Sequence, residues 1–360
     1  MKIAVSTLSD VSMNIGTSVR AKRVFELLQK EYDCTLIIRG RGQSKVDNVN
    51  LIKPSKFWNF QLIQVVRKNR FDLIYCASDF WGFFTYFALA KLYNFKIVFE
   101  AHGILSLERE YGLHNPNLID KVGIKMLEVR EKFVARHADC IIALCSDIYK
   151  HYARFNTCIV LVPNFVDETN FKRQENPAQW QSDGDEGKTI GLIGPFAQNR
   201  GINTYILDFV YRNIDKFDER IKFIVIGACD YKKIQNERIE YTSYLNDFHE
   251  YADRLMRLDA VLVASRYPTS GPLTKILESM ACSVPVFTTP DSAVGLDHVT
   301  AGEDIFISEE SELVTKVNES LFDSDLMERV GKNARRTIEK HYGVEVNKEK
   351  LIAVIEQLDI

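Results

Sequence analysis

The 360-residue sequence lacks the features that mark several classes of protein. Its seven cysteines form no C-x-x-C pair and several lie in apolar runs, as do small core residues of a reduced, cytosolic protein. The most hydrophobic run, residues 80–93, is too short to span a membrane and contains Lys91. We expect no signal peptide, because residues 1–6 already have the pattern of a strand. We therefore predict a cytoplasmic protein. Any contact that it makes with a membrane would be peripheral, at the inner face of the cell membrane.

A strong net charge is also absent. The formal charge of −3 argues against general nucleic-acid binding. The charge is uneven, however: residues 1–70 hold thirteen Lys/Arg and five Asp/Glu, a balance of +8, which leaves −11 for the rest. This basic part suits an acidic partner, such as anionic lipid or a phosphate-bearing acceptor. Residues 53–70, which mix basic and aromatic side chains, fit either an interfacial segment or an ordinary surface helix.

Short repeats and low-complexity tracts are absent as well, and apolar strands alternate with amphipathic helices along the whole chain. That alternation predicts an α/β protein with parallel sheets covered by helices. The polar, aperiodic stretch 172–188 indicates a linker. Within it Asp183 and Asp185 follow no strand, so we predict no metal site there.

One stretch, residues 259–289, holds a strand, a turn, a helix and a second strand. Pro272 suits the first helical position, with Ser270 or Gly271 as the cap. Lys275 and Glu278 are three residues apart and share a helix face. A helix that begins just after a strand's carboxyl end favours an anion, and such a cation and carboxylate suit a nucleotide. A core βαβ unit with a solvated Lys–Glu pair is the equally weighted alternative.

Other candidate residues also follow predicted strands. His102 stands beside Gly103 at one strand end, and Arg200 closes a loop after Gly194. Gly16 lies in a polar loop after the first strand. In the helix that we predict from about Ser18, basic residues crowd the first turns, which is unfavourable unless an anion is nearby; they are Arg20, Lys22 and Arg23.

Together these segments resemble glycosyltransferase family 4, over nearly the full length. The quoted elements are, in order, VFEAHG ending at Gly103, EKFVARHADCIIALCS at 131–146, VPNFVD at 162–167, the loop 191–201, the stretch 259–289, GED at 302–304, and NAR at 333–335 followed by HY at 341–342. Each element is weak alone, whereas their order and spacing are specific. The form Pro272-x-x-Lys275-x-x-Glu278 resembles a "PxKxxE" subgroup of this family.

The resemblance implies the GT-B fold: α/β, with two Rossmann-like domains whose parallel sheets face a central cleft. The implied division is an acceptor-side domain at 1–167, a linker at 168–188 and a nucleotide-sugar-binding domain at 189–340. The segment 341–360 is expected to pack back on the first domain as a helix.

The same resemblance implies a retaining transfer of a sugar from a nucleotide diphosphate to an acceptor hydroxyl. Catalytic roles are expected for His102, Arg200 and Lys275, with Glu278 on the ribose. Donor-binding roles are expected for Gly194, Arg200, Ser270, Gly271, Pro272, Lys275 and Glu278, with Gly16 in a loop near the donor. No metal or cofactor is implied. The expected partners are the nucleotide sugar and a glycan or lipid-linked acceptor, in glycan, polysaccharide or glycolipid synthesis.

Two positions depart from the family pattern. Ser270 stands where the first of two glutamates is usual, and Pro195 stands where an arginine is usual. These departures keep open a non-catalytic nucleotide-sugar-binding homologue, acting as a subunit or regulator. A GT-B enzyme of another reaction, such as an epimerase, is a third alternative. Base, sugar, acceptor and oligomeric state are not identified by the sequence.

Overall fold

The computed structural model describes residues 1–8, 16–38, 49–51, 58–113, 115–171, 187–196, 201–242, 245, 247–269 and 271–358. The chain forms two compact units, residues 1–164 with 347–360, and residues 165–346. Within the described residues, no helix has both the length and the apolar character that crossing a bilayer requires.

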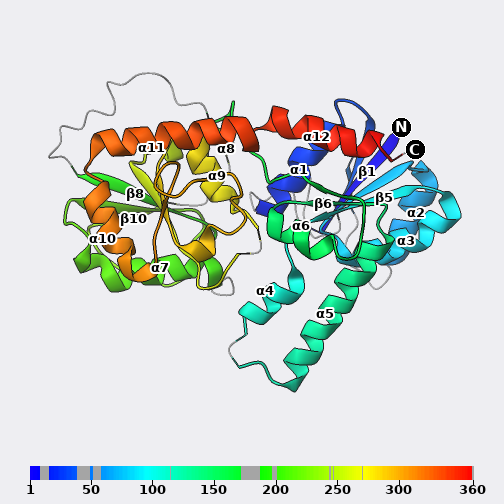
Figure 1. Ribbon diagram of the computed structural model, residues 1–360, viewed down its shortest axis with the longest axis horizontal. Helices are drawn as coiled ribbons and strands as arrows, with labels where there is room; N and C mark the ends of the chain where they lie inside the picture. Colours follow the sequence, from blue (N-terminus) through cyan, green and yellow to red (C-terminus); the bar gives the residue numbers. More distant parts are fainter. Residues whose placement is uncertain are drawn as a thin grey trace. The chain divides into compact units, whose positions relative to one another are not determined.

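The first unit is built on a parallel sheet of the order β3-β2-β1-β4-β5-β6-β7 (Figure 1). Its strands are β1 (Lys2–Thr7), β2 (Asp33–Ile38), β3 (Val49–Leu51), β4 (Leu73–Ala77), β5 (Lys96–Ala101), β6 (Cys140–Ala143) and β7 (Ile159–Leu161). Its helices are α1 (Gly16–Leu28), α2 (Trp58–Asn69), α3 (Phe80–Tyr93), α4 (Leu105–Tyr111), α5 (Leu118–His137) and α6 (Ser146–Tyr152). The central strands β1, β4, β5 and β6 are mainly apolar and almost wholly buried, as expected for a parallel sheet with helices on both faces.

The second unit repeats this plan with the strand order β10-β9-β8-β11-β12-β13. Its strands are β8 (Lys188–Ile193), β9 (Ile221–Ile226), β10 (Ile239–Tyr241), β11 (Ala260–Val263), β12 (Val286–Thr288) and β13 (Phe306–Ile307). Its helices are α7 (Gly201–Asn213), α8 (Phe248–Met256), α9 (Thr274–Ala281), α10 (Glu310–Ser320) and α11 (Ser324–Thr337), with short helical turns at Ile214–Lys216, Pro290–Ser292 and Ile338–Tyr342. The last helix, α12 (Val344–Glu356), runs from this unit into the residues that belong to the first.

In both sheets the chain reverses its direction of progress at one point: between β1 and β4, and between β8 and β11. At such a switch point the loops leave in opposite directions and open a crevice at the carboxyl ends of the strands, which is where α/β sheets bind ligands. Gly227, at φ +124°, lets the neighbouring loops approach there, since a Cβ would lie 2.2 Å from the carbonyl oxygen of Gly194.

The structure corrects several sequence predictions. Leu105–Tyr111 forms α4, which the sequence analysis did not identify because so short a helix gives little periodicity to detect. Gly16 is the first residue of α1 instead of a loop residue. The helix expected from Pro272 begins at Thr274 with Leu273 as N-cap and without a side-chain cap. Strand Val49–Leu51 was missed, and most of the linker, residues 172–186 with Asp183 and Asp185, lies outside the described residues.

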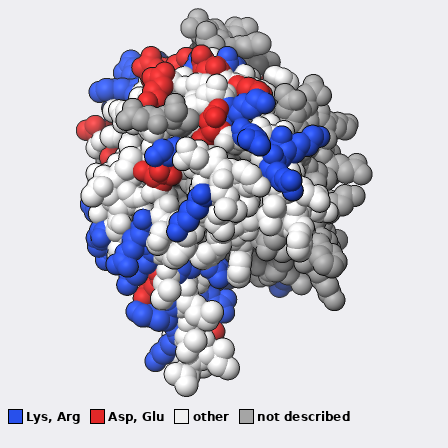
Figure 2. All heavy atoms as spheres, turned by 90° about the vertical axis from the view of Figure 1, so that its right-hand side faces the viewer, with Lys and Arg blue, Asp and Glu red and all other residues white. Residues whose placement is uncertain are grey.

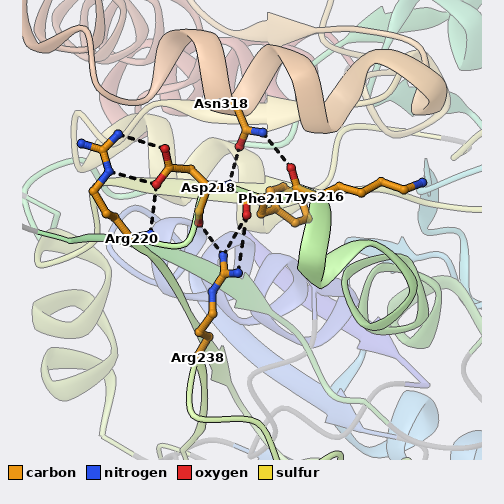
Figure 3. A network of polar contacts seen from close by, with 6 residues as sticks. All are labelled: Lys216, Phe217, Asp218, Arg220, Arg238 and Asn318. Carbon is orange, nitrogen blue, oxygen red and sulfur yellow. Dashed lines mark hydrogen bonds and ion pairs between the residues drawn. The ribbon is translucent and has the colours of Figure 1, made fainter.

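A polar network fixes the turn before β9 in the second unit (Figure 3). Arg238 donates to the carbonyl oxygens of Asp218 at 2.5 Å and Ile221 at 2.9 Å. Asp218 forms an ion pair with Arg220 at 2.9 Å, and this partner's hydrogen bonds lower the pKa of the Asp218 carboxyl to about 2. From α10, Asn318 accepts from the Asp218 amide at 3.0 Å. These charged groups thus bond to backbone and to each other, so we assign them to the scaffold.

Candidate functional site

Lys275 lies at the switch point of the second sheet. Its Nζ donates to the carbonyl oxygen of Ile193, the last residue of β8, at 2.7 Å. β8 is the strand that pairs with β11, and α9 follows β11 along the chain. The cation predicted from the helical spacing therefore lies at the sheet edge where a ligand is expected.

Asn203 of α7 holds the same ammonium group. Its Oδ1 accepts from Lys275 Nζ at 2.8 Å, while its Nδ2 donates to the carbonyl oxygen of Pro195 at 3.1 Å. Gly194 makes room for this amide, because a Cβ there would lie 3.0 Å from the Asn203 side chain. The sequence analysis missed Asn203. Its position just after the loop 191–201 was the one available signal.

The charge of Lys275 is not balanced by a carboxylate within the described residues, where its two acceptors are a backbone carbonyl and an amide oxygen. Burial lowers the pKa of Lys275 to about 8. A cation that is desolvated and unpaired gains the most from an incoming anion. The alternative of a solvated Lys–Glu pair is therefore wrong.

Glu278, one turn further along α9, is buried and bonds elsewhere. Its Oε2 accepts from the hydroxyl of Tyr251, on α8, at 2.9 Å. Tyr251 is a second residue that the sequence analysis missed, because no local pattern links it to a glutamate 27 positions away.

The turn before α9 is closely packed. Gly295, at φ +84°, faces it, and a Cβ at 295 would lie 2.8 Å from the nitrogen of Pro272. Leu273 offers the helix end no side-chain acceptor, and the first turn of α9 has no acidic residue. Gly271 and Pro272 thus precede a helix whose amino end has no acidic residue, and anion binding at this end stays a prediction. Ser270 and Arg200, the other predicted donor residues, lie outside the described residues.

In the first unit, His102 follows β5 and bonds to Glu100, two residues earlier. The distance from His102 Nε2 to Glu100 Oε1 is 2.5 Å. Glu100 is fully buried, and its other oxygen accepts from Arg20 Nε at 2.9 Å, from Arg20 Nη2 at 2.7 Å and from the hydroxyl of Tyr75. Because the carboxylate accepts from Nε2, it fixes the orientation of the imidazole and leaves Nδ1 as its other polar atom.

The charges of this first network compensate one another. Burial alone would raise the pKa of the Glu100 carboxyl, but Arg20 and His102 together hold it well below its usual range. Burial likewise opposes the charge of Arg20, and Glu100 and Tyr75 outweigh it and raise the pKa of the guanidinium. Glu100 is thus the anion that the basic first turns of α1 required. The sequence analysis assigned no role to Glu100.

Two family profiles match the chain. Residues 17–170 match Glycosyltransferase Family 4, and residues 187–323 match Glycosyl transferases group 1. No curated protein matches the sequence.

Similar solved structures span nearly the whole chain at low identity. Anabaena HepE in complex with UDP-glucose is 15% identical, with a TM-score of 0.77 over 99% of this chain and 100% of that one. Sucrose-phosphate synthase from Thermosynechococcus elongatus is 15% identical, with a TM-score of 0.79 over 99% and 98%. The lipopolysaccharide outer core galactosyltransferase WaaB is 14% identical, with a TM-score of 0.69 over 99% of each chain. These likenesses establish the GT-B fold, and together with the two profiles they place this chain among the GT-B glycosyltransferases of the family 4 kind.

Proposed function

We propose that this chain is a retaining glycosyltransferase that moves a sugar from a nucleotide diphosphate donor to an acceptor hydroxyl. The observation that carries the proposal is Lys275, a part-buried cation at the switch point whose two described acceptors are uncharged. The acceptor would be a glycan, a polysaccharide or a lipid-linked sugar. Its synthesis would take place in the cytoplasm, at the inner face of the cell membrane.

In the proposed step, the bond between the anomeric carbon and the diphosphate oxygen breaks, a bond to the acceptor oxygen forms, and the proton of the acceptor hydroxyl passes to the departing diphosphate. The sugar passes through an oxocarbenium-like state while negative charge grows on the diphosphate. Lys275, Arg200 and the amino end of α9 would stabilise that charge more in the transition state than in the ground state. We propose that these protein cations do this work and that no metal ion is required.

The other residues would orient the reactants. Glu278 would accept hydrogen bonds from the ribose hydroxyls of the donor, with Tyr251 holding its carboxylate through the 2.9 Å bond. His102, held by Glu100, would lie near the transferred sugar, and Gly16 near the donor. Gly194, Gly271 and Pro272 would shape the donor site, together with Ser270.

The first test is a thermal-shift screen of nucleotide diphosphates, because a ligand that binds only the native state raises the apparent melting temperature. UDP comes first, since HepE was solved with UDP-glucose. Transfer and donor hydrolysis are then measured with the nucleotide sugars that bind. Binding without either reaction would favour the non-catalytic subunit or regulator instead.

The second test removes the proposed cations. The double variant Arg200→Ala with Lys275→Ala should lose several kcal/mol of transition-state stabilisation, given about 2.7–4 kcal/mol for each strong electrostatic donor. The control is Lys332→Ala, whose exposed ammonium pairs with Glu328 at 2.5 Å on α11. Transfer near the wild-type rate in the double variant would show the assignment to be wrong. For Glu278→Ala, unchanged nucleotide affinity would exclude the ribose role.

A further inference from the structure

Helices α4 and α5 form a hairpin that stands out from the sheet of the first unit (Figure 1). Its base is fixed by the buried Glu131 of α5, which accepts from the amide of Ser106 at 3.0 Å and from its hydroxyl at 2.7 Å. Near its tip, Arg109 of α4 pairs with Asp120 of α5 at 3.4 Å. Asp120 also completes a capping box with Asn117 at the start of α5. The hairpin is therefore a well-formed element.

The tip of α5 exposes large aliphatic side chains. Ile119 is 82% exposed, Leu118 78% and Met126 63%, and Val122 and Val129 are also more than half exposed. Their spacing of three and four residues places them on one face of the helix. We call these five residues the tip face. An ordinary protein surface exposes single, scattered apolar residues. A contiguous exposed apolar patch of this kind instead marks an interaction site.

The tip face continues onto α3. Phe133, one turn after Val129 on α5, stacks on the exposed Phe84 at 5.0 Å between ring centroids. The guanidinium of Arg130 lies 4.0 Å from the ring centroid of Trp81, which is also exposed. Tryptophan and arginine together suit a surface that is apolar on one side and polar on the other. The exposed apolar surface therefore runs from the tip toward the body of the unit.

Basic residues border this surface. Lys121 and Lys125 are exposed on the turns that carry the tip face, next to it on the helix. Two of the carboxylates in this helix are engaged: Asp120 with Arg109, and Glu131 with Ser106. Glu128 pairs with Lys125 at 2.6 Å. In Figure 2 the projecting end consists mostly of uncharged residues, with Lys and Arg along its sides.

We propose that the tip face inserts into the surface of an anionic lipid bilayer and that Lys121 and Lys125 contact its headgroups. The hairpin end is convex and aliphatic, so it suits insertion among acyl chains better than a groove. An amphipathic helix with lysines beside its apolar face is typical of elements that lie in a membrane interface. This differs from the interfacial role that the sequence suggested for residues 53–70, of which 53–57 lie outside the described residues.

Vesicle co-sedimentation of the full chain tests the proposal. We expect binding to vesicles of phosphatidylglycerol and phosphatidylcholine, and at least tenfold weaker binding for Leu118→Ser with Ile119→Ser and Met126→Ser. Lys121→Gln with Lys125→Gln should reduce the preference for these vesicles over pure phosphatidylcholine about threefold or more. The matched control is Phe60→Ser on α2, because Phe60 is 64% exposed in the same unit. We expect it to bind as the wild type does.

Three outcomes would overturn the proposal. In the first, the triple variant binds vesicles as tightly as the wild type. In the second, Phe60→Ser loses binding, which would place the membrane contact in residues 53–70. In the third, the wild type sediments as a dimer without vesicles and the triple variant as a monomer, which would mean that the tip face binds a second copy of the chain. The proposal does not rest on sugar transfer. A thermal shift with UDP, measured on the same variants, keeps the two questions separate.

Discussion

Each unit has a cation at the carboxyl edge of its sheet, and the surroundings of the two cations differ: Arg20 is fully buried and Lys275 is part-buried. Arg20 is fully buried against Glu100, with Tyr75 and His102 on the same carboxylate. Lys275 bonds to uncharged oxygens, and burial lowers its pKa to about 8. The charge of the first cation, Arg20, is balanced by the carboxylate of Glu100. The second lacks a counter-charge in the described residues, and a ligand can supply it.

This difference separates structural charge from functional charge. Removing one partner of a buried ion pair strands the other, which costs folding free energy. Removing a part-buried cation without a carboxylate partner removes a desolvation penalty, which offsets the loss of its two hydrogen bonds, so folding should suffer little while ligand binding does. The contrast therefore predicts opposite outcomes for two similar substitutions.

The largest expected effect is on the first network. Arg20→Met leaves Glu100 buried without its ion-pair partner and should destabilise the first unit by about 3–5 kcal/mol. Hydrogen exchange of amides in β1, β4 and β5 measures this locally, without assuming that both units unfold together. Adding Glu100→Gln should recover part of the loss, because the stranded charge is removed.

The control for this variant is Arg212→Met, which breaks an exposed contact with Glu310 at 3.9 Å. Such surface pairs contribute about 0–1 kcal/mol. If Arg20→Met were no more destabilising than this control, the first network would not be the structural element that its geometry indicates.

The second effect falls on Lys275. Lys275→Met should reduce sugar transfer by about 10²–10³, the usual effect of one lost electrostatic donor. Stability of the second unit at pH 7 should stay equal or rise, since the penalty of a desolvated ammonium disappears. Steady-state kinetics and urea unfolding of the same variant test both statements. A variant that lost stability along with activity would show that Lys275 belongs to the scaffold.

The part of this contrast that the sequence could predict is its local part. The alternation of strands and helices predicted the parallel α/β sheets, and the spacing of Lys275 and Glu278 predicted that both lie on one helix that follows a strand. The basic first turns of α1 even required an anion. The sequence could not identify this anion as Glu100, because Arg20 and Glu100 are 80 positions apart and come into contact only when β5 lies in the sheet.

Separation along the chain also explains why Asn203 and Tyr251 were not predicted from the sequence. They contact Lys275 and Glu278 across 72 and 27 positions, and an asparagine or tyrosine in a helix has many commoner explanations. Helix α4 was not predicted from the sequence for another reason. Its seven residues are fixed by tertiary contact with α5, such as the Ser106–Glu131 bonds, more than by their own periodicity.

A smaller effect should appear in the pH dependence of stability. The pKa of Lys275 is about 8 in the folded chain, against about 10.4 for a free lysine. Between these values the unfolded chain holds a proton that the folded chain has released, so stability rises with pH, by at most about 1.4 kcal/mol per unit. Below pH 8 both states are protonated and this contribution is constant.

Other groups titrate in the same range, so the measurement is the difference between the wild type and Lys275→Met from pH 7 to 10.5. The wild type should gain stability over that range relative to the variant. A bound nucleotide diphosphate should shift the rise to higher pH, because its charge favours the ammonium form. Parallel curves for the two proteins would contradict the burial of an unpaired cation at this position.

The smallest expected effect concerns Tyr251. Tyr251→Phe removes the hydroxyl that donates to Glu278 at 2.9 Å, worth about 0.5–1.5 kcal/mol. If Glu278 binds the ribose, a less restrained carboxylate should weaken nucleotide binding by about two- to tenfold. Tyr211→Phe is the matched control, since its hydroxyl bonds to Tyr241 at 2.7 Å in the same unit. It should lower stability by a similar amount and leave affinity unchanged, so equal affinities for the two variants would place Tyr251 in the scaffold.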